Sequence, residues 1–201
     1  DGQITTAKLA NGAVTVAKTT GLAGDPGFQV VAEDTTIGNY TSPNAAVGTS
    51  EQAGTALYTD ADNGGNMGTN ATITRLGETI KTGHASIGQT AVSIKMYLKK
   101  TNTPTDTVYC RVYNSSNVLQ ATFGSMSASD LTTSYIEYTF SGATHVIAAG
   151  DKFVAETTAH ASNGISLSRA SSNNVANAEA TYYNGSWVDL ATNEAYMTIY
   201  S

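Results

Sequence analysis

The feature that most constrains this chain is a series of short segments in which apolar and polar residues alternate. In VSIKMYLKK, residues 92–100, the apolar positions are Val92, Ile94, Met96 and Leu98, and the positions between them are Ser93, Lys95, Tyr97 and Lys99. Successive side chains of a strand point to opposite faces, so this pattern predicts one buried face and one wet face. An antiparallel sheet has such faces.

Similar segments occur before and after it at near-regular intervals. They are ITRLGETI, TVYCRVY, VLQATF, YIEYTF, KFVAET, GISLSRA, EATYY and AYMTIY, with turn clusters such as TNTPTD, YNSSN, AAGD and YNGS between them. Roughly eight to ten short strands without sustained helical spacing predict an all-β fold, a jelly-roll-like antiparallel β-sandwich. We place this sandwich at residues 70–201.

The chain before residue 70 has a different character. Residues 1–24 contain two ten-residue repeats, DGQITTAKLA and NGAVTVAKTT, and the Gly-rich run GLAGDPG follows at 21–27. Residues 25–69 are interpreted as a neck or as the first strands and loops of the next domain. The repeats are too short for stable isolated helices, and Ile4, Leu9, Val14 and Val16 have no intrachain core within reach. We therefore expect these four residues to mediate oligomerisation.

The repeats ITTAKLANG and AVTVAKTTG resemble those in tail fibres, head fibres and related structural proteins of phages and other viruses. The resemblance covers residues 1–21 and departs from the family pattern at 19–21, where Thr-Thr-Gly stands. It implies a homotrimer attached to other virion proteins through its N-terminal segment, on the extracellular virion surface.

The later segments resemble a second kind of module. RLGETIKTG, SIKMYLKKTNTPTDTVYCRVYNSSN, LTTSYIEYTFSGATHVIAAGDKFVAE and the late GSW are similar to jelly-roll domains that resemble carbohydrate-binding modules. Such domains recur in viral fibres and secreted surface proteins. The resemblance implies a binding or structural role, and it names no ligand.

Charge and hydropathy exclude two classes of partner. The formal net charge is −6 and no basic stripe is present, so clustered cations that could neutralise phosphates are missing and nucleic acid is not expected. The purely apolar runs are far shorter than the ~20 residues that cross a bilayer, so membrane insertion is not expected. The single Cys110 is expected to be a buried core residue.

Catalytic and metal-binding patterns are weak. The three histidines have no metal-ligand spacing, and no HExxH, CxxC or GxSxG occurs, so we expect neither an enzyme nor a cofactor. In DADNGGN, Asp60, Asp62 and Asn63 could offer oxygen ligands to calcium, but Gly64 and Ala71 stand where an EF-hand loop needs ligands. A polar turn is the favoured interpretation, and no metal is expected.

The best candidate for ligand contact is EATYYNGSWVD. Tyr182 and Tyr183 should point to opposite faces of a strand, Asn184 should open a tight turn, and Trp187 follows it. Aromatic faces can stack on the C–H surfaces of sugars, while amides hydrogen-bond sugar hydroxyls, so these four residues are the predicted glycan contacts. The alternative is that Trp187 packs in the core or at an interface.

These observations favour a non-enzymatic, homotrimeric virion protein, such as a fibre, spike or decoration subunit, whose β-sandwich contacts host-surface glycans. One alternative is a monomeric carbohydrate-binding module of a secreted microbial enzyme or surface-layer protein. Another is a capsid-stabilising decoration protein without a ligand.

Overall fold

The computed structural model describes residues 54–60, 64–171 and 174–201, and these form one compact unit of strands. No α-helix occurs among them. The strands are β1 (Ala56–Asp60), β2 (Gly65–Gly68), β3 (Arg75–Ile80), β4 (Thr90–Ala91), β5 (Ser93–Thr101), β6 (Thr107–Tyr113), β7 (Leu119–Ser127), β8 (Ile136–Phe140), β9 (His145–Val146), β10 (Lys152–Glu156), β11 (Gly164–Arg169), β12 (Ala178–Tyr183), β13 (Trp187–Leu190) and β14 (Met197–Tyr200). A 3₁₀ turn, η2 (Ala128–Asp130), follows β7. The predicted all-β class is confirmed.

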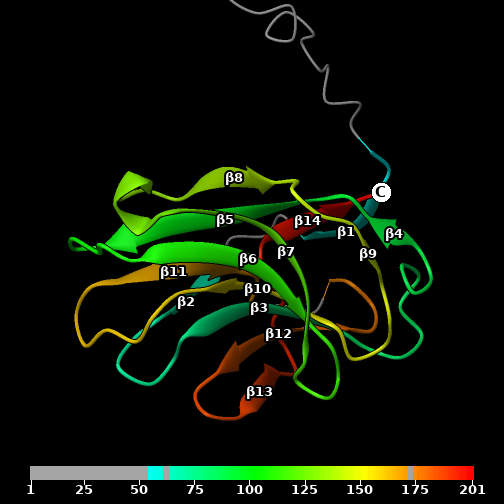
Figure 1. The fold of residues 1–201 in the computed structure, drawn as a ribbon. Helices are drawn as coiled ribbons and strands as arrows, with labels where there is room; N and C mark the ends of the chain where they lie inside the picture. The colour runs from blue at the N-terminus through cyan, green and yellow to red at the C-terminus, as the bar shows by residue number, and fades with distance from the viewer. Residues whose placement is uncertain (1–53, 61–63, 172–173) are drawn as a thin grey trace, which may run out of the picture. The chain divides into compact units, whose positions relative to one another are not determined.

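Two six-stranded sheets make up the sandwich (Figure 1). Sheet A has the order β1-β14-β5-β11-β2. β14 and β11 pair with one edge of β5, and β8 pairs with its other edge. Sheet B has the order β13-β12-β3-β10-β6-β7, and β4 and β9 form a separate two-stranded ribbon. All pairings are antiparallel, which agrees with the predicted antiparallel sandwich.

The alternation seen in the sequence places the core between the sheets. In β5, Ile94, Met96 and Leu98 are fully buried. Val92 differs from the prediction because it precedes the strand, and 37% of it is exposed. Cys110 is buried as expected, and burial raises the pKa of its thiol.

Two strands of the sandwich lie within residues 25–69, for which the sequence left open a neck or the first strands and loops of the next domain. β1 pairs with β14 and β2 pairs with β11, so both strands belong to sheet A. The predicted oligomerisation residues Ile4, Leu9, Val14 and Val16 lie outside the described residues.

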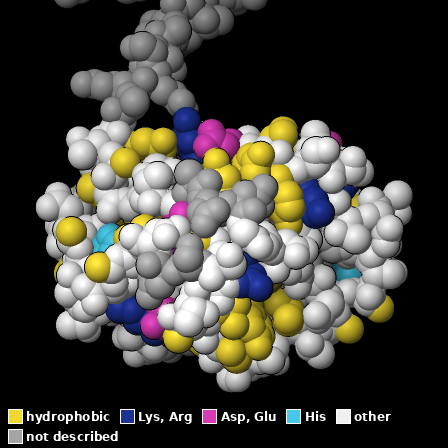
Figure 2. Space-filling model, turned by 180° about the vertical axis from the view of Figure 1, so that it is seen from behind, with side chains coloured by type: hydrophobic (Ala, Val, Ile, Leu, Met, Phe, Trp, Pro, Cys, Tyr) yellow, Lys and Arg dark blue, Asp and Glu magenta, His cyan; other side chains and the backbone are white. Residues whose placement is uncertain are grey.

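The surface carries few charges. Charged residues make up 13% of the chain, about half the usual share of roughly 25%. Figure 2 shows one side of the molecule, where polar uncharged groups dominate and the charged side chains lie scattered among them. Among the described residues, no helix is long and apolar enough to cross a membrane.

One buried polar contact ties the two sheets together. The Glu78 carboxylate on the inner face of sheet B accepts a hydrogen bond of 2.6 Å from the backbone N–H of Ala195, and the Tyr58 hydroxyl donates to the Ala195 carbonyl at 3.1 Å. Burial raises the pKa of Glu78 well above its usual value, outweighing the hydrogen bond from Ala195, and the carboxylates of Glu194 and Asp60 raise it further. Glu78 therefore favours its protonated form in the folded protein.

This raised pKa makes stability depend on pH. Above about pH 4.3, the usual pKa of Glu, the unfolded chain releases a proton that the folded protein retains, so the free energy of unfolding falls as pH rises. The Tm of the wild-type protein should therefore fall between about pH 5 and about pH 8, and the Tm of Glu78→Gln should fall less. Gln keeps an acceptor for the Ala195 N–H but does not titrate. Thermal melts of both proteins at the two pH values check this. Equal pH dependence in the two proteins would contradict it.

Candidate ligand-binding face

The outer face of sheet B gathers aromatic and charged side chains from five strands. Register places Tyr183, Arg75, Glu156 and Tyr109 side by side across β12, β3, β10 and β6, and Trp187 of β13 pairs with Tyr183. Each belongs to the set of alternate residues that points away from the core. We call this surface the B face.

Arg75 lies at the centre of an aromatic group. Its guanidinium is 4.2 Å from the ring centroid of Tyr113 and 4.3 Å from that of Tyr183, and the Trp187 ring is 5.6 Å away. Cations within about 6 Å of an aromatic ring face are attracted to its quadrupole. Arg75 therefore holds three rings from three different strands together.

Glu156 fixes the positions of the charged groups. Its Oε1 lies 3.2 Å from Arg75 Nε, and its Oε2 lies 3.1 Å from Arg111 Nη1 and accepts a 2.5 Å hydrogen bond from the Tyr113 hydroxyl. Burial and this carboxylate raise the pKa of Tyr113, so its hydroxyl remains a donor. Arg111 in turn lies over the Tyr109 ring, at 4.1 Å from its centroid.

Trp187 lies across this face. Its ring is 5.1 Å from the Tyr183 centroid and 5.9 Å from that of Tyr113, although Tyr113 belongs to the fourth strand along from β13. The indole N–H donates to Asn117 Oδ1 in the β6–β7 turn at 2.9 Å. This bond fixes the end of the indole, so Trp187 is part of an ordered surface.

The residues beneath these rings are small and apolar. Val154 lies on the B face between Gly77 and Arg111. It is fully buried, but it does not belong to the core cluster between the sheets. At Gly77, an added Cβ would lie 1.9 Å from the Phe153 carbonyl oxygen. Strands β3 and β10 therefore approach closely, which any larger residue would prevent.

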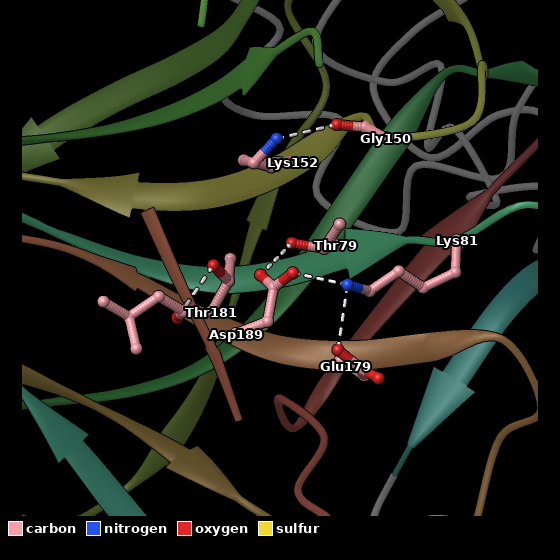
Figure 3. A network of polar contacts seen from close by, with 8 residues as sticks. Thr79, Lys81, Gly150, Lys152, Glu179, Thr181 and Asp189 are labelled. Carbon is pink, nitrogen blue, oxygen red and sulfur yellow. Dashed lines mark hydrogen bonds and ion pairs between the residues drawn. The ribbon is translucent and has the colours of Figure 1, made fainter. Parts of the chain in front are cut away.

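The other end of the B face is polar (Figure 3). Lys81 bonds the carboxylate of Asp189 and lies 2.9 Å from Glu179 Oε2, while Thr79 donates to Asp189 at 2.9 Å. Burial opposes the charge of Asp189, but hydrogen bonds from Lys81, Thr181 and Thr79 hold its pKa below the usual value. Asp189 is therefore ionised at neutral pH.

The predicted contact residues separate in the structure. Tyr183 and Trp187 lie together on the B face, whereas Tyr182 points inward and packs against the core. Asn184 is exposed in the β12–β13 turn, where its backbone N–H donates to the Ser186 carbonyl at 3.2 Å. Tyr182 is therefore no contact candidate. The sequence reasoning missed Arg75, Tyr113 and Glu156, since only strand pairing brings them together.

No metal centre is visible in the part of the chain that the structure describes. It contains no group of three or more His, Cys, Asp or Glu side chains that could hold a metal ion. Asp60 is buried on the inner side of sheet A. Asp62 and Asn63 lie outside the described residues, so the calcium interpretation stays untested.

Sheet A has an aromatic group of its own. On its outer face, the Tyr97 ring lies 5.6 Å from Tyr135 and 4.4 Å from Tyr196, and Lys99 Nζ lies 4.6 Å from the Tyr135 centroid. These rings stack on one another, in contrast to the rings that gather around a guanidinium on the B face. They provide matched control positions for experiments on the B face.

Comparison with known proteins identifies the class of the domain. Residues 58–194 match the family described as cellulose binding domain, and this range covers more than half of the chain. The chain therefore belongs to the cellulose binding domain family, a family of carbohydrate-binding modules. No curated protein and no solved structure matches it. This result supports the carbohydrate-binding alternative better than the virion interpretation, which no comparison supports.

The indole hydrogen bond can be tested alone. Asn117 has a backbone φ of +63°, so Asn117→Gly removes the acceptor without backbone strain. We expect a loss of about 0.5–1.5 kcal/mol in the free energy of unfolding and a red shift of tryptophan emission, because Trp187 is the only tryptophan. Denaturant unfolding and fluorescence spectra measure both effects. An unchanged spectrum would show that Asn117 does not hold the ring.

Proposed function

We propose that this domain is a non-catalytic module that binds the surface of a polysaccharide through the B face. The observation that carries the proposal is the group of Trp187, Tyr183 and Tyr113 around Arg75 on one outer face of a domain in this family. The family name makes cellulose, a β-linked glucan, the first ligand to test.

The chemistry of the face suits a sugar polymer. Aromatic rings offer flat apolar area for the C–H faces of sugar rings. Carboxylates and guanidinium groups accept and donate hydrogen bonds, which sugar hydroxyls can satisfy. Because ion pairs and stacking contacts hold these groups in place before a ligand arrives, binding orders few side chains and costs little entropy.

The extent of the face favours a polymer over a single sugar. Four strand-to-strand steps separate β13 from β6, which at about 4.8 Å each gives a width of about 19 Å. Within this width Trp187, Tyr183 and Tyr113 lie together around Arg75, and Tyr109 of β6 continues the face beyond Glu156. A ligand that spans them must be extended, as a polysaccharide chain is.

Two substitutions test this assignment. We expect Trp187→Ala and Tyr183→Ala each to weaken binding to insoluble cellulose by about tenfold or more, because truncating an aromatic contact residue commonly costs at least 1–2 kcal/mol. Depletion of protein from solution by increasing amounts of cellulose gives the affinities.

Tyr97→Ala, on the outer face of sheet A, is the control and should bind as wild type does. Circular dichroism establishes that all variants are folded. Equal losses in the three variants, or no loss in Trp187→Ala, would rule out the B face as the binding surface.

The resemblance of residues 1–21 to viral fibre repeats supports a second proposal, on assembly. We propose that residues 1–24 trimerise the chain and attach it to other virion proteins, so that the domain contacts host-surface glycans from the virion surface. The full chain should then have three times the monomer mass at micromolar concentration in light scattering. Deletion of residues 1–24 should give a monomer with an unchanged circular dichroism spectrum. A monomeric full chain would exclude trimerisation.

A further inference from the structure

Lys152 is a buried cation within the B face. Only 7% of it is exposed, and strand register places it between Thr79 of β3 and Tyr113 of β6. Its Nζ donates to the Gly150 carbonyl at 2.9 Å and lies 5.3 Å from the centroid of the Trp187 ring. An ammonium group carries three donors, so two N–H groups remain beside the tryptophan that we assign to ligand contact.

The carboxylates near Lys152 are engaged with other groups. Glu156 pairs with two arginines, and Asp189 and Glu179 both pair with the neighbouring lysine (Figure 3). The Asp151 carboxylate bonds a histidine ring at 2.6 Å and a backbone N–H at 2.7 Å. Among the described residues, Lys152 has no ion-pair partner. The polar end of the B face thus holds Lys81 and Lys152 beside Asp189 and Glu179, and both of these carboxylates pair directly with Lys81.

Burying a charge without a partner costs free energy. Burial lowers the pKa of the Lys152 ammonium group; the charge of Asp189 opposes this shift, Lys81 adds to it, and Asp151 opposes it in turn, so the carboxylates offset the desolvation only in part. The Gly150 carbonyl and the Trp187 ring compensate part of that cost. An anion brought by a ligand would supply the missing partner and form a charge-assisted hydrogen bond.

We propose that Lys152 forms a subsite for an acidic group of the polysaccharide, so that the B face prefers glycans with carboxylate substituents over neutral glucans. This inference rests on the proposed function of the B face and specifies its ligand class. A sugar ring stacked on Trp187 would carry its carboxylate towards the ammonium group next to that ring. The ammonium group would hold that carboxylate by a charge-assisted hydrogen bond.

The test compares two forms of one polymer. Cellulose with its C6 hydroxymethyl groups oxidised to carboxylates is the acidic ligand, and the same untreated cellulose is the neutral one. We expect wild-type protein to bind the oxidised form about tenfold more tightly at low ionic strength, the value of one hydrogen bond to a charged group. Because salt screens such pairs, the preference should shrink as NaCl is added.

Lys152→Met keeps a long apolar stem against Trp187 and removes only the charge. It should bind oxidised and untreated cellulose with equal affinity, so that the preference for the oxidised form is lost. Lys99→Met is the matched control, because Lys99 also lies over an aromatic ring but on sheet A, and it should keep the preference. Circular dichroism and Tm confirm that both variants are folded.

The outcomes separate this inference from the function on which it rests. Wild-type binding to untreated cellulose without a preference for the oxidised form overturns the subsite and leaves the proposed function standing. Equal loss of the preference in Lys152→Met and Lys99→Met also overturns it, because general charge attraction would then be the cause. Binding of neither polymer refutes both.

Discussion

The arrangement of the B face depends on the carboxylate of Glu156. This single group binds two guanidinium groups and one phenol hydroxyl, which come from β3 and β6 on either side of its own strand. Each guanidinium then lies against an aromatic ring. Without the carboxylate, the cations of Arg75 and Arg111 would repel each other, and the rings that rest on them would lose their fixed positions.

The central strands of sheet B carry core residues on one face and the residues of the B face on the other. In β3, β10 and β6, inward residues such as Leu76, Phe153 and Val112 fill the core, while the residues between them form the B face. Because the period of a strand is two residues, a change on the outer face leaves the core contacts in place. The outer face can therefore change its side chains, as at Lys152, without a change in the core contacts.

The sequence predicts the parts of this arrangement that local pattern controls. Alternation in residues 93–101 gives the buried face of β5, and the succession of short strands gives the all-β sandwich. Tyr183 and Trp187 lie near each other in the sequence across one turn, so their association could be expected. Arg75, Tyr113 and Glu156 are about 40 to 80 positions apart, and only the pairing of β3, β10 and β6 brings them together. Such long-range register depends on the packing of the whole sandwich and leaves no local signal.

Composition also misleads at particular places. Residues 56–68 resemble a loop because Gly, Asn and Asp dominate them, yet β1 and β2 pair there with strands from the far end of the chain. Tyr182 and Tyr183 are identical in type, and only their position in the strand decides that one packs against the core while the other lies on the outer face.

Binding on the outer face of a sheet, as proposed for the B face, limits the affinity of one domain. Its groups hold one another in place, so ordering costs are low, but the outer face of a sheet removes less ligand surface from water than a cleft does. A polysaccharide surface presents the same unit many times, and joined copies of a weak site then gain through effective concentration. Under the two proposals, the B face would bind a repetitive ligand, and the N-terminal repeats would gain avidity by joining several such faces.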